Sequence, residues 1–397
     1  MKSVKKLDVT TQIAVLGAGA MGGGIAQLAA SHGHSVVLYD SNPEQILKAQ
    51  SAIDKSLKRQ VEKGQLDETA ARSLMKRIIL ADNVDAIRDC GLIIEAIIEV
   101  LKAKQDLFSK VENLVEPEAV LATNTSSLSI SSIASSCRDP SRVIGIHFFN
   151  PAPIMPLVEI IPGLLTSDLV SHSARALIDG WGKTTVLAKD TPGFIVNRIA
   201  RPFYSEALRI FEEGIADRAT IDWAMKHVGG FRMGPFELMD FIGNDVNYKV
   251  TEIVFESFFY DPRFKPSLTQ KRLVEAKLFG RKSGRGHYDY SNDALIAKPN
   301  EDLKLGREIV DRILAMLINE AADAVFLQVA SIEDIDLAMT KGVNYPRGLL
   351  EWADDLGIPE VLTQLEELQA EYGEDRYRPN PLLRRMARNG NTFYGKN

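Results

Sequence analysis

A glycine-rich turn near the N-terminus restricts the fold of this chain more than any other segment. The apolar run Ile13–Leu16 leads directly into GAGAMG, residues 17–22, and helix-forming residues follow. In this setting the first glycine permits a tight turn, the second lets a pyrophosphate approach the backbone, and the third lets the helix pack on the strand. The start of the helix attracts phosphate groups. We expect a dinucleotide to contact Gly17, Gly19, Ala20, Met21 and Gly22.

Asp40 indicates which dinucleotide binds. It ends the apolar run VVLYD, 18 residues after Gly22, where a carboxylate accepts hydrogen bonds from both hydroxyls of the adenosine ribose. A phosphate on that ribose would be repelled, and Ser-Asn-Pro follows instead of an arginine. The pattern therefore favours NAD over NADP. The alternative is a glycine turn that serves packing alone.

Eight apolar runs and helix-length segments alternate between residues 13 and 190. Several runs lack a polar face, which is typical of strands covered by helices on both sides. Segments 43–63 and 102–115 are long enough to serve as right-handed crossovers. After the turn at 190–193 the strands stop, and residues 194–213 predict one long helix. The predicted fold class is α/β, with a doubly wound, mostly parallel sheet of the Rossmann type followed by an all-α region.

The helical region repeats itself with an offset of 114 residues. Residues 195–243 align with 309–357 without a gap, with 15 identities in 49 positions, whereas chance would give about three at a residue frequency of roughly 6%. We therefore expect a dinucleotide-binding domain at 1–190, a first all-α domain at 191–290 and a second, degenerate copy at 291–397. The two copies should pair across a pseudo-twofold interface.

Charge and cysteine content exclude several classes of protein. A formal net charge of −6 opposes binding to nucleic acid. Cys90 and Cys137, the two cysteines, lie in different segments and build neither a disulfide framework nor a zinc site. No stretch reaches about 18 unbroken apolar residues, so we expect no membrane insertion. We expect a cytoplasmic protein without a metal.

Polar residues occupy three segments that should end at the same edge of the sheet: 124–127 (NTSS), 147–151 (HFFNP) and Glu159. Ligands of open α/β sheets gather at that edge. Histidine suits general acid/base work near neutral pH, and a carboxylate on its far nitrogen would orient the ring. Spacing alone does not pair His147 with Glu159, and Ser126 and Asn197 have structural alternatives as a helix cap and an exposed helix position. The residues alone predict an NAD-dependent oxidoreductase with a histidine base.

Six motifs together resemble the L-3-hydroxyacyl-CoA dehydrogenase family. They match in order and spacing from about residue 12 to 290, and they read VLGAGAMGGGIAQ, IIEAIIEVLKAKQDLF, ATNTSSLSI, GIHFFNPAPIMPLVEII, KDTPGFIVNRI and MGPFELMDFIG. The resemblance implies reversible hydride transfer between C3 of an (S)-3-hydroxyacyl-CoA, such as 3-hydroxybutyryl-CoA, and NAD. Acyl chain length, an ω-carboxylate preference and the pathway stay open, among butyrate, polymer-precursor, fatty-acid β-oxidation and aromatic-acid metabolism.

The resemblance also implies roles for individual residues. His147 would take the proton of the 3-hydroxyl group, with Glu159 holding its ring, while Ser126 and Asn197 bond the 3-oxygen and Asn150 positions the thioester. Residues expected near the nicotinamide ribose are Glu99, Lys104 and Asn124. Residues expected near coenzyme A are Ser56 and Lys63, within a basic run that also contains Lys55, Lys58 and Arg59. The alternative for that run is a solvated helix face.

The second copy departs from the first where function is expected. Asn197 aligns with Asp311, and no second glycine turn accompanies it, so the copy has lost direct catalytic contact. Short family members dimerise through one helical domain, so this chain is expected either as a homodimer or as a monomer whose copies pair internally. Two alternatives to the main function are a dehydrogenase of free 3-hydroxy acids and a catalytically silent NAD-binding or structural protein.

Overall fold

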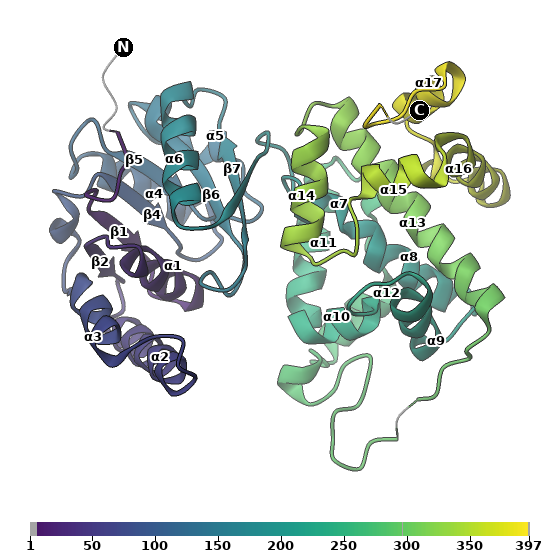
Figure 1. Cartoon of the computed structure of the whole chain (residues 1–397), viewed down its shortest axis with the longest axis horizontal. Helices are drawn as coiled ribbons and strands as arrows, with labels where there is room; N and C mark the ends of the chain where they lie inside the picture. Colours follow the sequence, from purple (N-terminus) through teal and green to yellow (C-terminus); the bar gives the residue numbers. More distant parts are fainter. Residues whose placement is uncertain (1–5, 296, 396–397) are drawn as a thin grey trace. The chain divides into compact units, whose positions relative to one another are not determined.

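The structure, a computed structural model, describes residues 6–295 and 297–395 (Figure 1). It divides into two compact units, and the boundary along the chain lies between Thr191 and Pro192. None of the helices in these described ranges is long and apolar enough to cross a membrane.

The first unit contains one eight-stranded sheet with the order β3-β2-β1-β4-β5-β6-β7-β8. All neighbouring strands pair in parallel except β6 and β7, which are antiparallel. Each of the eight predicted apolar runs forms one of these strands, so the predicted doubly wound, mostly parallel sheet is confirmed. The strands are β1 Ile13–Leu16, β2 Val36–Tyr39, β3 Ile78–Ala81, β4 Leu92–Glu95, β5 Val120–Thr123, β6 Val143–Phe148, β7 Leu157–Pro162 and β8 Thr184–Leu187.

Six α-helices connect the strands and cover the sheet. They are α1 Ala20–Ser31, α2 Pro43–Glu62, α3 Glu68–Arg77, α4 Leu101–Glu112, α5 Ile130–Ala134 and α6 Asp168–Gly180. Apolar side chains of α1, α2 and α6 form one continuous core with alternate residues of the strands, because successive strand residues face opposite sides of a sheet. The predicted crossovers at 43–63 and 102–115 correspond to α2 and α4. This framework carries the carboxyl ends of β1, β2, β4, β5 and β6 to one edge of the sheet.

The second unit is all-α. Its helices are α7 Val196–Ile199, α8 Arg201–Glu212, α9 Arg218–Trp223, α10 Pro235–Ile242, α11 Asn244–Ser257, α12 Leu268–Glu275, α13 Leu303–Phe326, α14 Ile332–Gly342, α15 Leu349–Leu356, α16 Ile358–Tyr372 and α17 Pro381–Asn389. The prediction of one helix over 194–213 was wrong, because two helices, α7 and α8, occupy this segment. Pro202 explains the break: it lacks an N–H donor, and its ring would clash with the carbonyl group of Arg198 in a continuous helix.

Matching contacts in the two halves of this unit demonstrate the duplication. Asp222 accepts hydrogen bonds from two backbone N–H groups of the first turn of α10, and Asp336, 114 residues later, does the same for α15. Each of these aspartates also accepts a hydrogen bond from a tyrosine hydroxyl, 2.8 Å from Tyr288 and 2.9 Å from Tyr394. The fold class with two related helical copies is therefore confirmed, whereas the boundary at 290 stays a prediction.

Candidate active site

The glycine turn after β1 has the shape that a pyrophosphate requires. Gly17 has φ +103°, and a Cβ there would lie 2.5 Å from the carbonyl oxygen of Ala96. A Cβ on Gly22 would lie 1.8 Å from the carbonyl oxygen of Gly17, so this position also has no room for a side chain. At Gly19, in contrast, a Cβ would meet no atom within 4 Å. The first and third glycines thus serve packing, while the second leaves an open approach to the backbone.

The start of α1 and the end of β2 complete a fit for NAD. No side chain caps α1, whose N-cap is Gly19, so its first backbone N–H groups are available to a phosphate. Asp40 follows β2, and its carboxylate accepts hydrogen bonds from the backbone N–H groups of Ala18 at 2.7 Å and Asn42 at 2.8 Å. These bonds hold a negative charge beside the glycine turn. Ala20 and Met21 lie in the first turn of α1.

His147 and Glu159 form a buried pair in the sheet. They lie directly opposite each other on β6 and β7, and His147 Nδ1 is 2.7 Å from Glu159 Oε2. The exposed fraction is 6% for His147 and 0% for Glu159. The antiparallel pairing of these strands brings the two residues together, which spacing along the chain did not reveal. A carboxylate on Nδ1 fixes the orientation of the ring, and Nε2 is the atom that such a pair uses for proton transfer.

The segment after β5, which contains Asn124 and Ser126, forms hydrogen bonds with β6, the strand of His147, and with Glu99. Asn124 accepts a hydrogen bond from the backbone N–H of Phe148 through its side-chain oxygen, at 2.8 Å. Ser126 donates its backbone N–H to Glu99 Oε1 at 3.0 Å. The alternative role of Ser126 as a helix cap is wrong, because Ser129 caps α5. Asn124 and Ser126 therefore lie at the strand edge that carries His147.

Glu95 is a site residue that sequence reasoning missed. Its carboxylate is fully buried at the end of β4 and accepts hydrogen bonds from Lys104 Nζ at 2.6 Å and Thr123 Oγ1 at 2.6 Å. Lys104 also pairs with Glu99 at 3.2 Å. Burial raises the pKa of Glu99, but Lys104 and hydrogen bonds from Thr125 outweigh it and lower that pKa overall. The sequence signal that could have revealed Glu95 is a charged residue inside an otherwise apolar run, LIIEAII.

Lys104 itself is enclosed, with an exposed fraction of 1%. Its ammonium group contacts the carboxylates of Glu95 and Glu99 and, at 3.4 Å, the carbonyl oxygen of Ile97. In this arrangement Lys104 orients Glu99, which in turn holds Ser126. The structure thus links three of the residues expected around the nicotinamide ribose and the substrate.

A cavity of about 1130 Å³ brings together the residues expected near coenzyme A. Ser56, Lys63 and Asn150 line it, along with Gly19 of the glycine turn. Basic residues that also line it are Lys48, Lys55, Arg59 and Lys183. Lys58 of the predicted basic run does not line this cavity and pairs with Asp54 at 2.7 Å instead. The positive lining suits an anionic nucleotide. The alternative for the basic run, a solvated helix face, does not explain why its residues line a cavity.

Asn197 lies in the second unit, on the one-turn helix α7, next to the buried Arg198. Its side chain is half-buried.

The glycine turn, the strand-end aspartate and the buried histidine–glutamate pair together fit an NAD-dependent oxidoreductase. Comparisons with known proteins agree with this class. Residues 12–191 match the NAD binding domain of 3-hydroxyacyl-CoA dehydrogenase. Residues 193–290 and 309–394 both match the C-terminal domain of that enzyme. The chain belongs to the 3-hydroxyacyl-CoA dehydrogenase family and is an NAD-dependent oxidoreductase.

Several named relatives cover most of the chain. The 3-hydroxyadipyl-CoA dehydrogenase of Escherichia coli (strain K12) is 38% identical, over 94% of this chain and 97% of the relative. A probable 3-hydroxybutyryl-CoA dehydrogenase of Bacillus subtilis (strain 168) is 42% identical but covers 70% of this chain and 97% of the relative. The crystal structure of 3-hydroxybutyryl-CoA dehydrogenase from Escherichia coli K12 has a TM-score of 0.91 and 38% identity, and it covers 96% of this chain and 98% of its own.

Proposed function

We propose that this chain interconverts an (S)-3-hydroxyacyl-CoA and the 3-oxoacyl-CoA, with His147 as the general acid/base. The observation that carries the proposal is the buried contact of 2.7 Å between His147 Nδ1 and Glu159 Oε2. With Nδ1–H donating a hydrogen bond to Glu159, the neutral ring presents the lone pair of Nε2 to the substrate. Nε2 takes the hydroxyl proton during oxidation and returns it to the 3-oxygen during reduction.

Other residues act on the substrate oxygen and the thioester. Ser126 and Asn197 donate hydrogen bonds to the 3-oxygen, where negative charge develops in the transition state. Asn150, at the rim of the cavity, positions the thioester, while Ser56 and Lys63 bind the nucleotide end of coenzyme A. The glycine turn and Asp40 would hold NAD, which would supply the acceptor for the hydride that leaves C3. Glu99, Lys104 and Asn124 would hold the strand edge on the side of its nicotinamide ribose.

We propose short 3-hydroxyacyl-CoA thioesters as substrates, with 3-hydroxybutyryl-CoA as the reference compound. Relatives that cover nearly the full chain carry the names 3-hydroxyadipyl-CoA and 3-hydroxybutyryl-CoA dehydrogenase, and the acyl groups in these names differ by a CH2–COOH unit that ends in an ω-carboxylate. Oxidation of NADH by acetoacetyl-CoA tests the class, run beside free acetoacetate and beside NADPH. We expect turnover of the thioester with NADH. Turnover of the free acid alone would assign the chain to hydroxy-acid dehydrogenases, and a parallel assay with 3-oxoadipyl-CoA tests the dicarboxylate.

A His147→Gln variant tests the acid/base role. Glutamine keeps a polar side chain of similar size but does not exchange a proton near neutral pH, so kcat should fall about 100-fold or more. The affinity for NADH should stay within about twofold of that of the unmodified enzyme. His172→Gln on the surface of α6 is the matched control and should retain full turnover. Near-normal turnover of His147→Gln would remove His147 from the mechanism.

The oligomeric state and compartment are also proposals. We propose a monomer whose two helical copies pair within the chain, because the contacts between them described below are those of a buried interface. The runner-up is a homodimer, and sedimentation equilibrium separates the two. We propose the cytoplasm as the compartment, since Cys90 and Cys137 are free and buried. Burial raises the pKa of the Cys90 thiol to about 12 and that of Cys137 to about 11.

A further inference from the structure

The helix that carries Asn197 has little stability of its own. Helix α7 spans four residues, Val196–Ile199, and its N-cap residue Ile195 makes no side-chain capping bond. One helical turn fixes several backbone angles for very few hydrogen bonds, so it needs tertiary contacts to persist. The side chain of Arg198, the next residue after Asn197, supplies such contacts and is 1% exposed.

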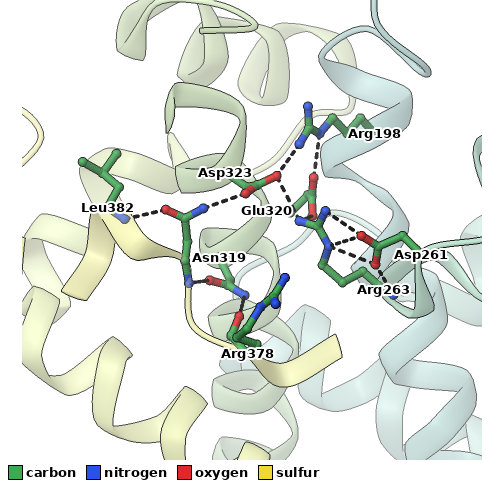
Figure 2. Close-up of polar contacts among 9 residues, drawn as sticks. Arg198, Asp261, Arg263, Asn319, Glu320, Asp323, Arg378 and Leu382 are labelled. Atoms are coloured by element: carbon green, nitrogen blue, oxygen red, sulfur yellow. Dashed lines mark hydrogen bonds and ion pairs between the residues drawn. The ribbon is translucent and has the colours of Figure 1, made fainter. Parts of the chain in front are cut away.

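Two carboxylates of the second helical copy bind Arg198 (Figure 2). Arg198 Nε lies 2.6 Å from Glu320 Oε1, and Arg198 Nη2 lies 2.5 Å from Asp323 Oδ2. Both acidic residues are on α13, one turn apart. The guanidinium group also packs over the ring of Phe258 at 5.0 Å. A planar group held at two nitrogens and one face has a fixed orientation, so α7 is fixed in its rotation about its own axis.

The same carboxylates are themselves held in place. Arg263 Nη1 contacts Glu320 Oε2 at 3.1 Å and Asp323 Oδ2 at 3.0 Å. Asn380 donates a hydrogen bond from Nδ2 to Asp323 Oδ1 at 2.6 Å. Arg263 also pairs with Asp261 at 2.9 Å. Burial lowers the pKa of Arg263, but Glu320, Asp261 and Asp323 outweigh it and raise that pKa overall. Arg263 therefore keeps its charge, and the cluster as a whole stays rigid.

A second arginine–glutamate pair joins the copies, with the arginine on the second copy and the glutamate on the first. Arg312 aligns with Arg198 and Glu206 with Glu320, both with the offset of 114 residues. Arg312 Nε lies 3.1 Å from Glu206 Oε2, and the side chains are 8% and 1% exposed. Each copy thus contributes its arginine to the glutamate of the other copy. Arg312, however, follows Asp311, which takes the place of Asn197 in the second copy.

We infer that Glu320 and Asp323 are positioning residues for the reaction, because they fix Arg198 and through it the orientation of Asn197. The inference rests on the proposed role of Asn197 at the substrate 3-oxygen. Successive residues of a helix point about 100° apart, so a rotation of α7 that follows loss of the Arg198 contact moves the Asn197 amide away from the oxygen. The degenerate copy, without catalytic groups of its own, then supports catalysis by the first copy.

Glu320→Gln and its pseudo-symmetric control Glu206→Gln test the inference in the full-length enzyme. Glutamine keeps the shape and one acceptor, so both variants lose one charge of a buried pair and should lower the thermal midpoint by similar amounts. We expect Glu320→Gln to lower kcat with acetoacetyl-CoA about 10-fold while the KM for NADH stays within about twofold. Glu206→Gln should keep kcat within about twofold. Equal kcat losses in the two variants would overturn the inference.

The same substitution in an Asn197→Ala background separates positioning from a general structural effect. If Glu320 acts through Asn197, then Glu320→Gln costs no more than about twofold once the amide is gone. A full 10-fold loss in that background would overturn the inference but leave the proposed function intact. Normal turnover of Asn197→Ala alone would overturn both the role of Asn197 and the inference. If Glu320→Gln fails to fold, Asp323→Asn should show a smaller, about threefold loss with the same dependence on Asn197.

Discussion

The two helical copies share a framework of polar contacts and differ at the position that we propose bonds the substrate oxygen. In both copies an aspartate binds the first turn of a later helix, a tyrosine binds that aspartate, and an arginine reaches the other copy's glutamate. Among the paired positions that have diverged are Pro202 and Met316, Asn197 and Asp311, and His287 and Phe393. Framework contacts have therefore been kept after duplication, whereas the helix break and the amide occur in the first copy.

The helix break should give the largest difference between the copies. Met316, 3% exposed, lies inside the continuous helix α13, so Met316→Pro removes an internal hydrogen bond and introduces a ring clash. We expect a loss of about 3 kcal/mol or more in the free energy of unfolding. Pro202, in the first turn of α8, needs no N–H donor there, so Pro202→Ala should cost about 1 kcal/mol or less.

Urea denaturation followed by circular dichroism measures both changes. Met316→Leu, which conserves volume, serves as the control and should cost less than about 1.5 kcal/mol. A Met316→Pro protein as stable as Met316→Leu would mean that α13 accepts a break as α7 and α8 do, and that the two copies do not differ in helix continuity.

Exchange of the paired residues at 197 and 311 tests the functional difference. Under the proposed role of Asn197, Asn197→Asp replaces a donor to the 3-oxygen with a negative charge, and kcat should fall about 100-fold, which corresponds to about 2.7 kcal/mol. The reverse exchange, Asp311→Asn, should leave kcat within about twofold. Steady-state kinetics with acetoacetyl-CoA and NADH measures both. A loss of similar size in Asp311→Asn would show that the second copy also contributes to catalysis.

Much of the fold could be predicted from the sequence because local patterns carry it. All eight strands coincide with apolar runs, since strands covered on both faces are continuously apolar. The break between α7 and α8 was missed because a proline near a helix start fits both a single helix and a new one. The duplication was visible in the sequence because residues that make the same contacts in both copies, such as Asp222 and Asp336, are identical.

The site could be predicted less completely, because its geometry depends on strand pairing. Neither His147 nor Glu159 alone identifies its partner, since antiparallel pairing of β6 with β7 sets them opposite each other. Glu95 was missed because a carboxylate at a strand end can be recognised as part of the site only when its contact with Lys104 is known. The ion pairs between Arg198 and Glu320 link residues 122 positions apart, and no local pattern indicates such a contact.

His287 is an ionisable residue of the first copy whose equivalent in the second copy, Phe393, does not titrate. Asp240 binds the backbone N–H of His287, and Asp354, 114 residues later, binds that of Phe393, so the two residues are equivalent. The imidazole is 6% exposed and packs at 4.9 Å against the ring of Phe236. Burial, with a smaller contribution from Arg218, lowers the pKa of His287 to about 3.

A depressed pKa makes the folded state less stable in acid. Below about pH 6.5 the unfolded chain binds a proton at His287 that the folded chain refuses, so stability is lost as the pH falls from about 6.5 toward 3. Relative to pH 8, the loss at pH 5 from this residue should be about 2 kcal/mol. His287→Phe, which installs the residue of the second copy, should remove this part of the pH dependence. Phe393→His should add a similar dependence.

Urea denaturation at pH 8 and at pH 5 gives the unfolding free energy of each variant at both pH values. Subtracting one value from the other removes any effect of the substitution on packing that is the same at the two pH values. We expect the difference to shrink by about 2 kcal/mol in His287→Phe. An unchanged difference would mean that His287 protonates in the folded state. In that event the equivalent positions of the two copies are alike in their response to acid, and the divergence of His287 from Phe393 has no consequence for the pH dependence of stability.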